Sequence, residues 1–426
     1  MVRSSPLTWL LLALLPAGCQ GPADDDDSAV TEVVFEPSLS YHGDIAVLRV
    51  GGTPYEMGVQ HGTMLREELL AGAAWIEQSE MGLLEPLADY YGLLDEAYAN
   101  SYPDVVDECQ GIVDAMDDEL WSMDRCLLVA YGDVVLEVMT HELGCSQFVV
   151  RDPATIDGSL IHARNLDWSK VDHIIDHPTL IVRFPDEGLV NVAFGFPGNV
   201  SPYSGMNAAG LALASNEAYG LNYPDRDGHS HTQMTRQLLA EAHSLDEVRA
   251  FYEAEDHVST ELVVVSDGVT GEASVFEMSD QGIGERALGE DGVLFATNHF
   301  VQQEMAALHQ PPTAGSAARY QRLDQLLTAD GDGSRHGELD LAGAVAILRD
   351  THNPATGETH PAELEDGGDS LANNGAIQSM VFLPAEGTIY VAGGGVPIPQ
   401  NPFEGFTLDD LFQVTGAGAP DPQTVP

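Results

Sequence analysis

A lone cysteine beside a glycine is the strongest candidate for chemistry in this sequence of 426 residues. Arg164 follows Cys145 by nineteen positions, and Asp167 comes three residues after that arginine. If the chain is cut between Gly144 and Cys145, the cysteine gains an α-amine whose reference pKa is about 7.7–8.0. That amine can accept the thiol proton, so the nucleophile carries its own general base and needs no catalytic histidine.

The segment after the cysteine predicts a β-hairpin that returns the two charged residues to it. Strand-like stretches at 146–151 and 159–164 flank a polar turn. In such a hairpin, Asp167 can hold the liberated α-ammonium and Arg164 can favour the thiolate through its charge. Gly144 suits the scission, because glycine adopts unusual backbone geometry at low steric cost where the thiol attacks the preceding carbonyl.

Each of these residues also has a plainer structural interpretation. A free cysteine at the start of a strand is most often a buried core thiol, and an arginine three residues from an aspartate is usually a surface ion pair. Other signatures are missing: the sequence has no Gly-x-Ser-x-Gly elbow, no His-Glu-x-x-His, no paired Cys-x-x-Cys and no glycine-rich phosphate loop. The sequence therefore predicts neither a serine esterase nor a zinc site, and no cofactor.

The elements that must position this motif fall into a helical part and a strand-rich part. Apolar residues recur at helical spacing from Tyr55 to about His141. From Cys145 onward, strands dominate, which predicts an α+β fold of antiparallel sheets with helices outside them. Helices are expected at 232–242, 245–253, 317–327 and 341–349. Further strands are expected at 44–50, 179–184, 189–194, 210–215, 261–266, 273–278, 292–297, 379–383 and 388–392.

The first residues predict an export signal. Arg3 precedes a short apolar run, 7–15, that is too short to span a bilayer, so 1–18 is expected to be a signal peptide. Small residues before Cys19 resemble a bacterial lipobox, in which this cysteine is lipidated, although Pro16 departs from that pattern. An ordinary cleaved signal is the alternative.

An acidic linker is expected at 19–42, and its four consecutive aspartates favour the lipid-anchored form. The protein is then exported to the periplasm or cell envelope, and this anchor is its only expected contact with a membrane. A net charge of −52, with Lys170 as the one lysine, excludes nucleic acid and anionic membranes as main partners. In an oxidising compartment Cys109 and Cys126 form a disulfide, or they remain two buried thiols.

Two stretches resemble one superfamily of enzymes. Residues 145–168, CSQFVVRDPATIDGSLIHARNLDW, resemble the start of the mature chain in choloylglycine hydrolases, penicillin V acylases and the acid ceramidase group. Residues 52–62, GTPYEMGVQHG, resemble the pro-segment of the peptidase C45 group, which includes the acyltransferase that acts on 6-aminopenicillanic acid. The resemblance implies a four-layer αββα N-terminal-nucleophile hydrolase sandwich. It also implies a mainly helical pro-segment, 43–144, that stays associated with a catalytic domain, 145–426.

The resemblance also implies roles for further residues. Asn298 matches the oxyanion-hole asparagine. Asn216 resembles the second oxyanion donor, with Asn207 as its rival. Arg319 resembles the arginine that orders the active-site network. For the asparagines, a turn or strand-end side chain that bonds the backbone is the alternative. The residues expected to support the hairpin rather than take part in the chemistry are His162 and Asn165.

Together these features predict a self-cleaving cysteine amidohydrolase that cleaves a linear N-acyl amide through a thioester on Cys145. The expected partner is a small-molecule N-acyl substrate, and apolar residues in 194–203 and around Phe300 are candidates for its pocket. Acyl transfer to another amine is the first alternative. A lipid or ester hydrolase of the phospholipase B-like kind and a catalytically inactive, lipid-anchored binding protein also stay open.

Overall fold

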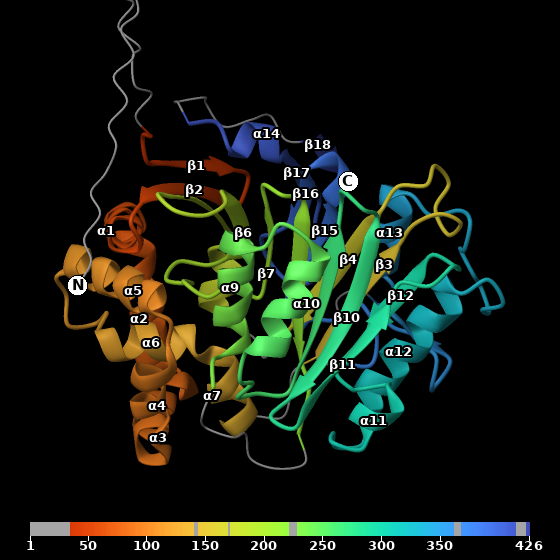
Figure 1. Cartoon of the computed structure of the whole chain (residues 1–426), viewed down its shortest axis with the longest axis horizontal. Helices are drawn as coiled ribbons and strands as arrows, with labels where there is room; N and C mark the ends of the chain where they lie inside the picture. Colours follow the sequence, from red (N-terminus) through yellow and green to blue (C-terminus); the bar gives the residue numbers. More distant parts are fainter. Residues whose placement is uncertain (1–34, 140–143, 169–170, 221–227, 362–367, 415–422) are drawn as a thin grey trace, which may run out of the picture. The chain divides into compact units, whose positions relative to one another are not determined.

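The computed structural model describes residues 35–139, 144–168, 171–220, 228–361, 368–414 and 423–426 (Figure 1). The expected signal peptide, 1–18, and the expected lipidation site, Cys19, lie outside these residues. In the described part, no helix combines the length and the apolarity that a membrane crossing requires.

The larger of two main sheets contains nine strands in the order β1-β2-β5-β6-β7-β8-β9-β10-β11. Strand β2 pairs with β5 in parallel. All the other neighbouring strands of this sheet pair with each other in the antiparallel direction. The strands are β1 (Ser38–His42), β2 (Ile45–Gly52), β5 (Thr179–Pro185), β6 (Asn191–Gly195), β7 (Ser204–Asn207), β8 (Leu211–Glu217), β9 (Glu261–Asp267), β10 (Glu272–Ser279) and β11 (Gly282–Ala287).

The second sheet contains seven strands in the order β12-β3-β4-β15-β16-β17-β18. These are β3 (Gly144–Val150), β4 (Ile161–Asp167), β12 (Val293–Ala296), β15 (Ala376–Leu383), β16 (Thr388–Ala392), β17 (Phe403–Thr407) and β18 (Gln423–Val425). A separate two-stranded ladder joins β13 (His352–Asn353) and β14 (Glu358–Thr359). The fold is therefore α+β with two large sheets, as the order of elements in the sequence predicts.

Helices precede the second sheet in the chain and also cover both sheets. Those before Cys145 are α1 (Pro54–Met64), α2 (Arg66–Gln78), η1 (Glu80–Leu83), α3 (Leu84–Tyr91), α4 (Leu93–Asn100), α5 (Pro103–Met116), α6 (Met123–Ala130) and α7 (Gly132–Met139). Those after it are α8 (Asp172–Asp176), α9 (His231–Glu241), α10 (Leu245–Ala254), α11 (Gln303–Ala306), α12 (Ala314–Leu327), α13 (Leu341–Leu348), η2 (Pro384–Glu386), η3 (Ile398–Gln400) and α14 (Leu408–Leu411).

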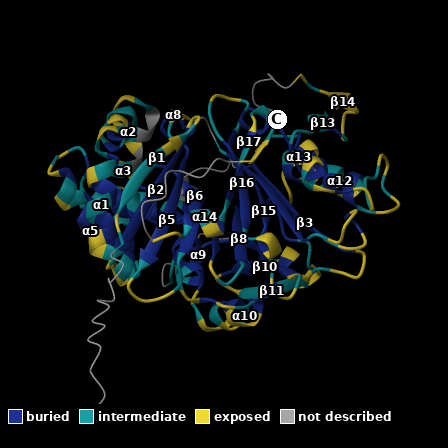
Figure 2. Ribbon diagram, turned by 90° about the horizontal axis from the view of Figure 1, so that it is seen from above, coloured by how far each residue is buried: buried dark blue, intermediate teal, exposed yellow. Residues whose placement is uncertain are grey.

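The inner strands of both sheets, such as β5 and β15, are buried on both faces and are dark blue in Figure 2, whereas the edge strands β1, β11 and β18 are half-buried or exposed. In β15, Met380 and Phe382 pack in one apolar cluster with Val182 of the larger sheet. The intervening Val381 packs in another cluster with Leu323 of α12. Because successive side chains point to opposite faces of a strand, each main sheet contributes one face to a shared core and one face to helices.

Helix α1 contains residues 54–62 of the motif and begins with a capping box. The Thr53 side chain accepts the backbone N–H of Glu56, and the Glu56 carboxylate accepts the backbone N–H of Thr53. A Cβ atom on Gly58 would lie 2.1 Å from the Glu108 carbonyl oxygen of α5. Glycine is therefore needed here because the α1 and α5 backbones approach too closely for a side chain.

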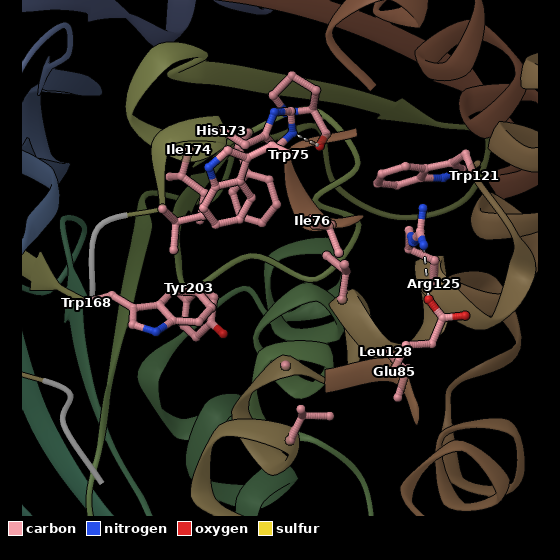
Figure 3. Close-up of a pocket in the computed structure, with 16 residues that line it drawn as sticks. Trp75, Ile76, Glu85, Trp121, Arg125, Leu128, Trp168, His173, Ile174 and Tyr203 are labelled. Atoms are coloured by element: carbon pink, nitrogen blue, oxygen red, sulfur yellow. Dashed lines mark hydrogen bonds and ion pairs between the residues drawn. The ribbon is translucent and has the colours of Figure 1, made fainter. Parts of the chain in front are cut away.

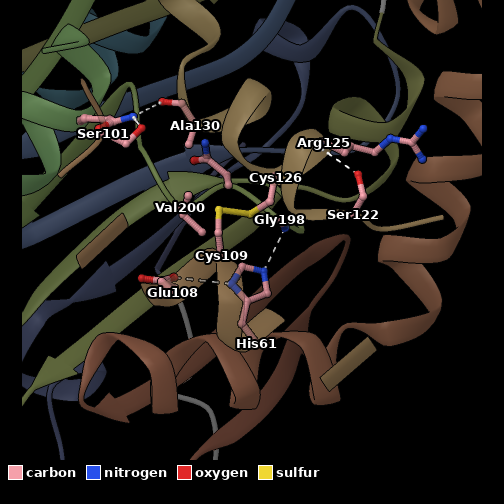
Figure 4. Close-up of a disulfide and its surroundings, with 12 residues drawn as sticks. His61, Ser101, Glu108, Cys109, Ser122, Arg125, Cys126, Ala130, Gly198 and Val200 are labelled. Carbon is pink, nitrogen blue, oxygen red and sulfur yellow. Dashed lines mark hydrogen bonds and ion pairs between the residues drawn. A yellow bond between two sulfur atoms is a disulfide. The ribbon is translucent and has the colours of Figure 1, made fainter. Parts of the chain in front are cut away.

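Helix α5 is tied to its neighbours by a disulfide and by buried ion pairs (Figure 4). Cys109 of α5 and Cys126 of α6 are disulfide-bonded, which resolves the alternative of two free thiols. Glu108 is completely buried and lies 3.0 Å from the Arg183 guanidinium and 2.5 Å from that of Arg236. His61 of the motif accepts the Gly198 backbone N–H at 2.9 Å, and burial lowers the pKa of its imidazole.

Two expectations from the sequence are wrong, one about the linker and one about the direction of the strands. The linker expected at 19–42 cannot extend to residue 42, because Ser38–His42 form β1 and pair with β2. The sheets are also not wholly antiparallel, since β2 and β5 run parallel. The helices expected from 232 to 349 are found within three residues of their bounds as α9, α10, α12 and α13.

Candidate active site

Strands β3 and β4 form the expected hairpin. Gly144 pairs with Asp167, and Gln147 pairs with Arg164, so both charged residues return to the start of β3. The Arg164 Nη2 atom lies 3.8 Å from Cys145 Sγ. The hairpin prediction is confirmed, and the sulfur and the guanidinium are in direct contact.

Arg164 is held rigidly by backbone groups of the larger sheet. Its guanidinium donates to the Tyr203 carbonyl at 3.0 Å and to the Ser215 carbonyl at 2.6 Å, and it also contacts the Ser204 hydroxyl. Burial raises the pKa of the Cys145 thiol, and the charge of Arg164 lowers it in part. The thiol is therefore protonated in the joined chain, and attack by its sulfur requires a base.

One carboxylate oxygen of Asp167 accepts no hydrogen bond among the described residues. Its Oδ2 atom accepts the Asn373 side-chain amide at 2.7 Å, whereas Oδ1 has no hydrogen-bond partner among the described residues. Burial raises the pKa of this carboxyl to about 6, against the opposing influence first of Arg319 and then of Asn373 and Arg164. An unpaired buried carboxylate oxygen beside Gly144 is suited to receive an ammonium group.

Asn298 and Arg319 fix the backbone of the cysteine itself. The Asn298 side-chain oxygen accepts the Cys145 backbone N–H at 2.7 Å and the Arg319 guanidinium at 2.9 Å. Arg319 also donates to the Cys145 carbonyl oxygen and, at 3.0 Å, to the Ser146 hydroxyl. Asn298 reaches this position because it follows β12, which pairs with β3.

The two asparagines expected in an oxyanion hole differ in their free donors. The Asn298 amide nitrogen donates to the Glu217 carbonyl at 2.8 Å, which leaves one of its two N–H bonds without a described acceptor. The Asn216 amide nitrogen donates to the Thr297 and Ala296 carbonyls at 3.0 and 3.5 Å. The Asn216 amide nitrogen therefore holds the segment that leads to Asn298.

Asn207 does not join this site. Its side-chain oxygen accepts the backbone N–H groups of Ala209 and Leu211, and its nitrogen donates to the Ala242 carbonyl at 2.8 Å. It lies at the turn of the β7–β8 hairpin, whereas Asn216 lies at the other end of β8, roughly 15 Å away along the strand. Asn207 is thus a turn residue and not the rival of Asn216.

His162 and Asn165 support the hairpin as expected. The His162 ring nitrogens contact the Ser266 hydroxyl at 3.0 Å and the Gln147 side chain at 3.2 Å. Burial lowers the pKa of this imidazole to about 3, so the ring is neutral at neutral pH. The Asn165 side chain donates to the Leu348 carbonyl at 2.9 Å and fastens β4 to α13.

An apolar cavity of about 120 Å³ lies beside the site (Figure 3). Its aromatic lining includes Trp75, Trp121, Trp168, Phe196 and Tyr203. Trp168 directly follows Asp167, and the carbonyl of Tyr203 accepts the Arg164 guanidinium. Cys145 belongs to the same apolar cluster as several of these side chains. The cavity and the nucleophile therefore border the same apolar cluster, although Cys145 itself does not line the cavity.

Only some of the residues expected to line a substrate pocket lie at this cavity. Phe196 and Tyr203 of the stretch 194–203 line it, whereas Phe194 packs in the core between the sheets. Phe300 packs against His309 in a separate cluster. Trp121 and the lining residues of α2, α6 and α7, which include Trp75, were not anticipated, because they precede Cys145 in the chain and give no local signal of a pocket.

Comparison with known protein families bears directly on this site. The sequence model of the family described as acyl-coenzyme A:6-aminopenicillanic acid acyl-transferase matches residues 155–395, which is more than half of the chain. The chain belongs to this acyl-transferase family. The matched residues include Arg164, Asp167, Asn298 and Arg319, and the match begins ten positions after Cys145.

Individual proteins and solved structures are similar to this acyl-transferase family chain at low identity. An uncharacterized protein of Archaeoglobus fulgidus is 24% identical over 403 residues, which covers 82% of this chain and 66% of that protein. The chain thus spans just under two thirds of that curated relative's length.

Two solved structures show a distant likeness. One is the Caenorhabditis elegans ortholog of N-acylethanolamine-hydrolyzing acid amidase (15% identity, TM-score 0.38, 62% of this chain and 100% of that one). The other is penicillin V acylase from Agrobacterium tumefaciens (16% identity, TM-score 0.40, 64% and 90%).

Proposed function

We propose that this protein is a self-cleaving cysteine amidohydrolase that hydrolyses a linear N-acyl amide through a thioester on Cys145. One observation carries the proposal. The Cys145 backbone nitrogen, which becomes the α-amine after scission, is bonded to Asn298 at 2.7 Å, while its sulfur lies 3.8 Å from Arg164. The base and the nucleophile of the mature enzyme thus belong to one residue whose two reactive atoms are both held in place.

Scission proceeds as an N-to-S acyl shift followed by hydrolysis. The sulfur of Cys145 attacks the carbonyl carbon of Gly144, the C–N bond breaks, and the thiol proton passes to the departing nitrogen. Water then adds to the thioester and the C–S bond breaks. This leaves a carboxylate on Gly144, and a thiol and an α-amine on Cys145. The second N–H of Asn298 is suited to the oxyanion, an interaction typically worth several kcal/mol in such sites.

Turnover repeats this chemistry on the substrate. The sulfur attacks the amide carbonyl, the α-amine carries the thiol proton to the leaving amine, and water releases the acyl group as a carboxylic acid. Asp167 holds the α-ammonium through its unpartnered Oδ1, and Arg319 orients Asn298. The apolar lining of the adjacent cavity supports an apolar acyl group.

The proposal divides the chain into a pro-segment, 43–144, and a catalytic domain, 145–426, in a four-layer αββα sandwich. Two features support lasting association of the two pieces. Strand β2 pairs with β5 across the division, and Glu108 forms buried ion pairs with Arg183 and Arg236. The shared core between the sheets and the helices packed on their other faces support the layering.

Export to the cell envelope and lipidation of Cys19 are part of the same proposal. The Cys109–Cys126 disulfide supports export, because disulfides persist mainly in oxidising compartments. Labelling with a fatty-acid analogue in wild type and Cys19→Ala tests the anchor, and label retained by the variant rejects it.

Acyl transfer to an amine is a second candidate, favoured by the description of the family. A panel of N-acyl amides and acyl esters, with and without added amines, separates these activities. Hydrolysis predicts free acid as the product in the presence of amine, whereas transfer predicts a new amide. Cleavage of esters but of no amide would favour a lipid or ester hydrolase instead.

A further inference from the structure

Two cavities of this protein share one wall. The apolar cavity beside the active site and a second, acidic cavity of about 730 Å³ are both lined by Glu85 and Arg125. On its other sides the second cavity is lined by polar and charged residues that include Glu77, Asp89 and Asp124. These two side chains therefore border both an apolar space and an acidic one, whose lining also contains Leu83 and Leu94.

The wall is built around the guanidinium of Arg125, whose side chain is 11% exposed. The Nη2 atom lies 3.1 Å from Glu85 and 3.6 Å from Glu77, and Nη1 donates to the Leu120 carbonyl. Arg125 lies at the start of α6, where the Ser122 hydroxyl accepts its backbone N–H at 3.1 Å. The Nε atom is buried without a partner among the described residues, so this guanidinium is not fully satisfied by its ion pairs.

The helix that carries this wall is anchored next to it. Cys126, the residue after Arg125, forms the disulfide to Cys109 of α5 (Figure 4). Arg125 therefore lies in the first turn of a helix that the disulfide holds in place.

The wall lies at the far end of the apolar cavity. In Figure 3, Arg125 and Glu85 lie across the cavity from Trp168 and Tyr203. Trp168 follows Asp167, and the Tyr203 carbonyl binds the arginine that contacts Cys145 Sγ, so that side is the catalytic end. An acyl chain that enters from the nucleophile points toward the ion pair.

We propose that the Arg125–Glu85 ion pair is the distal stop of the acyl-binding cavity and sets the longest acyl chain that binds well. The inference rests on the proposed function, because it takes the apolar cavity as the acyl site. Each additional buried methylene improves binding roughly fourfold. A methylene that reaches the ion pair must displace charged groups instead of filling apolar space, so the improvement stops there.

Binding of saturated fatty acids tests this stop without any turnover. Trp75, Trp121 and Trp168 all line the cavity, so intrinsic fluorescence reports its occupation. The acids, from butanoate to hexadecanoate, are titrated into the wild type, Glu85→Ala and Arg125→Ala. Glu85→Ala keeps the bond from Arg125 to the Leu120 carbonyl and therefore serves if Arg125→Ala folds poorly. Asp89→Ala, which changes only the second cavity, is the matched control.

If the ion pair is the stop, the affinity of the wild type for fatty acids rises with the length of the acyl chain and then levels off. Arg125→Ala should extend the rise, with hexadecanoate bound roughly tenfold or more tightly than by the wild type. Glu85→Ala should extend it to a smaller degree, because the Arg125 guanidinium stays at the cavity, and Asp89→Ala should behave as the wild type. The same cut-off in all four proteins, no cut-off in the wild type, or no binding of any acid would overturn the inference. Failure to cleave any N-acyl amide would instead contradict the proposed function and would leave the binding result standing.

Discussion

Gly144 and Asp167 face each other across the β3–β4 hairpin, and a Cβ atom on Gly144 would lie 3.2 Å from the Asp167 Oδ2 atom. The same Cβ atom would lie 3.3 Å from the Arg319 guanidinium. The residue before the nucleophile is thus enclosed by the two charged groups that order the site, and any side chain there displaces one of them. Position 144 is therefore suited to glycine because of the space that the charged groups of the site leave there, and not because of its backbone conformation.

A larger residue at position 144 should slow scission. Gly144→Val pushes the Asp167 carboxylate or the Arg319 guanidinium away from Cys145, and we expect scission to be at least roughly tenfold slower, which is about 1.4 kcal/mol in the barrier. Gel analysis of a time course after synthesis measures the rate. Gly395→Val is the control, because nothing lies within 4 Å of a Cβ atom there. Equal rates in Gly144→Val and the wild type would refute the steric argument.

The two asparagines should contribute unequally to turnover. Asn298 keeps one N–H for the oxyanion, so Asn298→Ala should lose roughly 100- to 1000-fold in kcat per mole of cleaved chain. Asn216→Ala should lose less, because its amide nitrogen already holds the 296–297 backbone. Asn207→Ala should keep its kcat and lose only stability. Equal losses for Asn298→Ala and Asn207→Ala would contradict the assignment.

Much of this site is predictable from local sequence, because the hairpin places residues that are close in the chain opposite one another. The spacing of Cys145, Arg164 and Asp167 predicts their contact once β3 and β4 are identified. Asn298 and Arg319 could be predicted only from the family resemblance, because they contact Cys145 from distant parts of the chain. These contacts come from strand pairing and helix packing between segments that carry no mutual signal.

Other features had no signal of their own. Asn373 binds Asp167 from 206 positions away, and its sequence context is that of any loop asparagine. Strands β7 and β11 were not predicted, because both contain glycines, which weaken the alternating pattern of a strand. The parallel pairing of β2 with β5 joins segments separated by all of the helices α1–α7, and periodicity within each strand says nothing about its partner.

The buried carboxylate of α5 should dominate the stability of the helical part. Glu108→Ala leaves Arg183 and Arg236 buried without their main partner, and removal of one member of a buried pair costs roughly 3–5 kcal/mol. Urea unfolding measures this loss. In the control Asp246→Ala, the carboxylate paired with Arg249 is 91% exposed, so the loss should stay below about 1 kcal/mol. Similar losses in the two variants would show that the network is not a major source of stability.

Buried acids near the site should make the protein less stable at alkaline pH. Burial raises the pKa of Glu137 to about 7, and burial raises the pKa of Glu217 in the same direction. A folded-state pKa above the unfolded value gives stability that is complete below pH 4.5 and is lost as the pH rises through 7. For Glu137 the loss amounts to roughly 3 kcal/mol.

Glu137→Gln isolates this contribution, because the amide stays neutral and its oxygen can still accept the Thr260 backbone N–H. Thermal unfolding measured across this pH range should show a smaller loss of stability between about pH 4.5 and 7 in Glu137→Gln than in the wild type. Asp246→Asn, at an exposed site, should follow the wild-type curve. A Glu137→Gln curve parallel to that of the wild type would mean that this carboxyl is not the source.

Intact-mass analysis of the purified wild type and of Cys145→Ala tests the central claim most directly. The Cys109–Cys126 disulfide lies wholly before Cys145 and cannot link the two pieces, so denaturing conditions separate them. We predict two wild-type chains that meet between Gly144 and Cys145, and a single chain in Cys145→Ala. A wild type that stays in one piece and never reacts with a thiol alkylator would contradict the account.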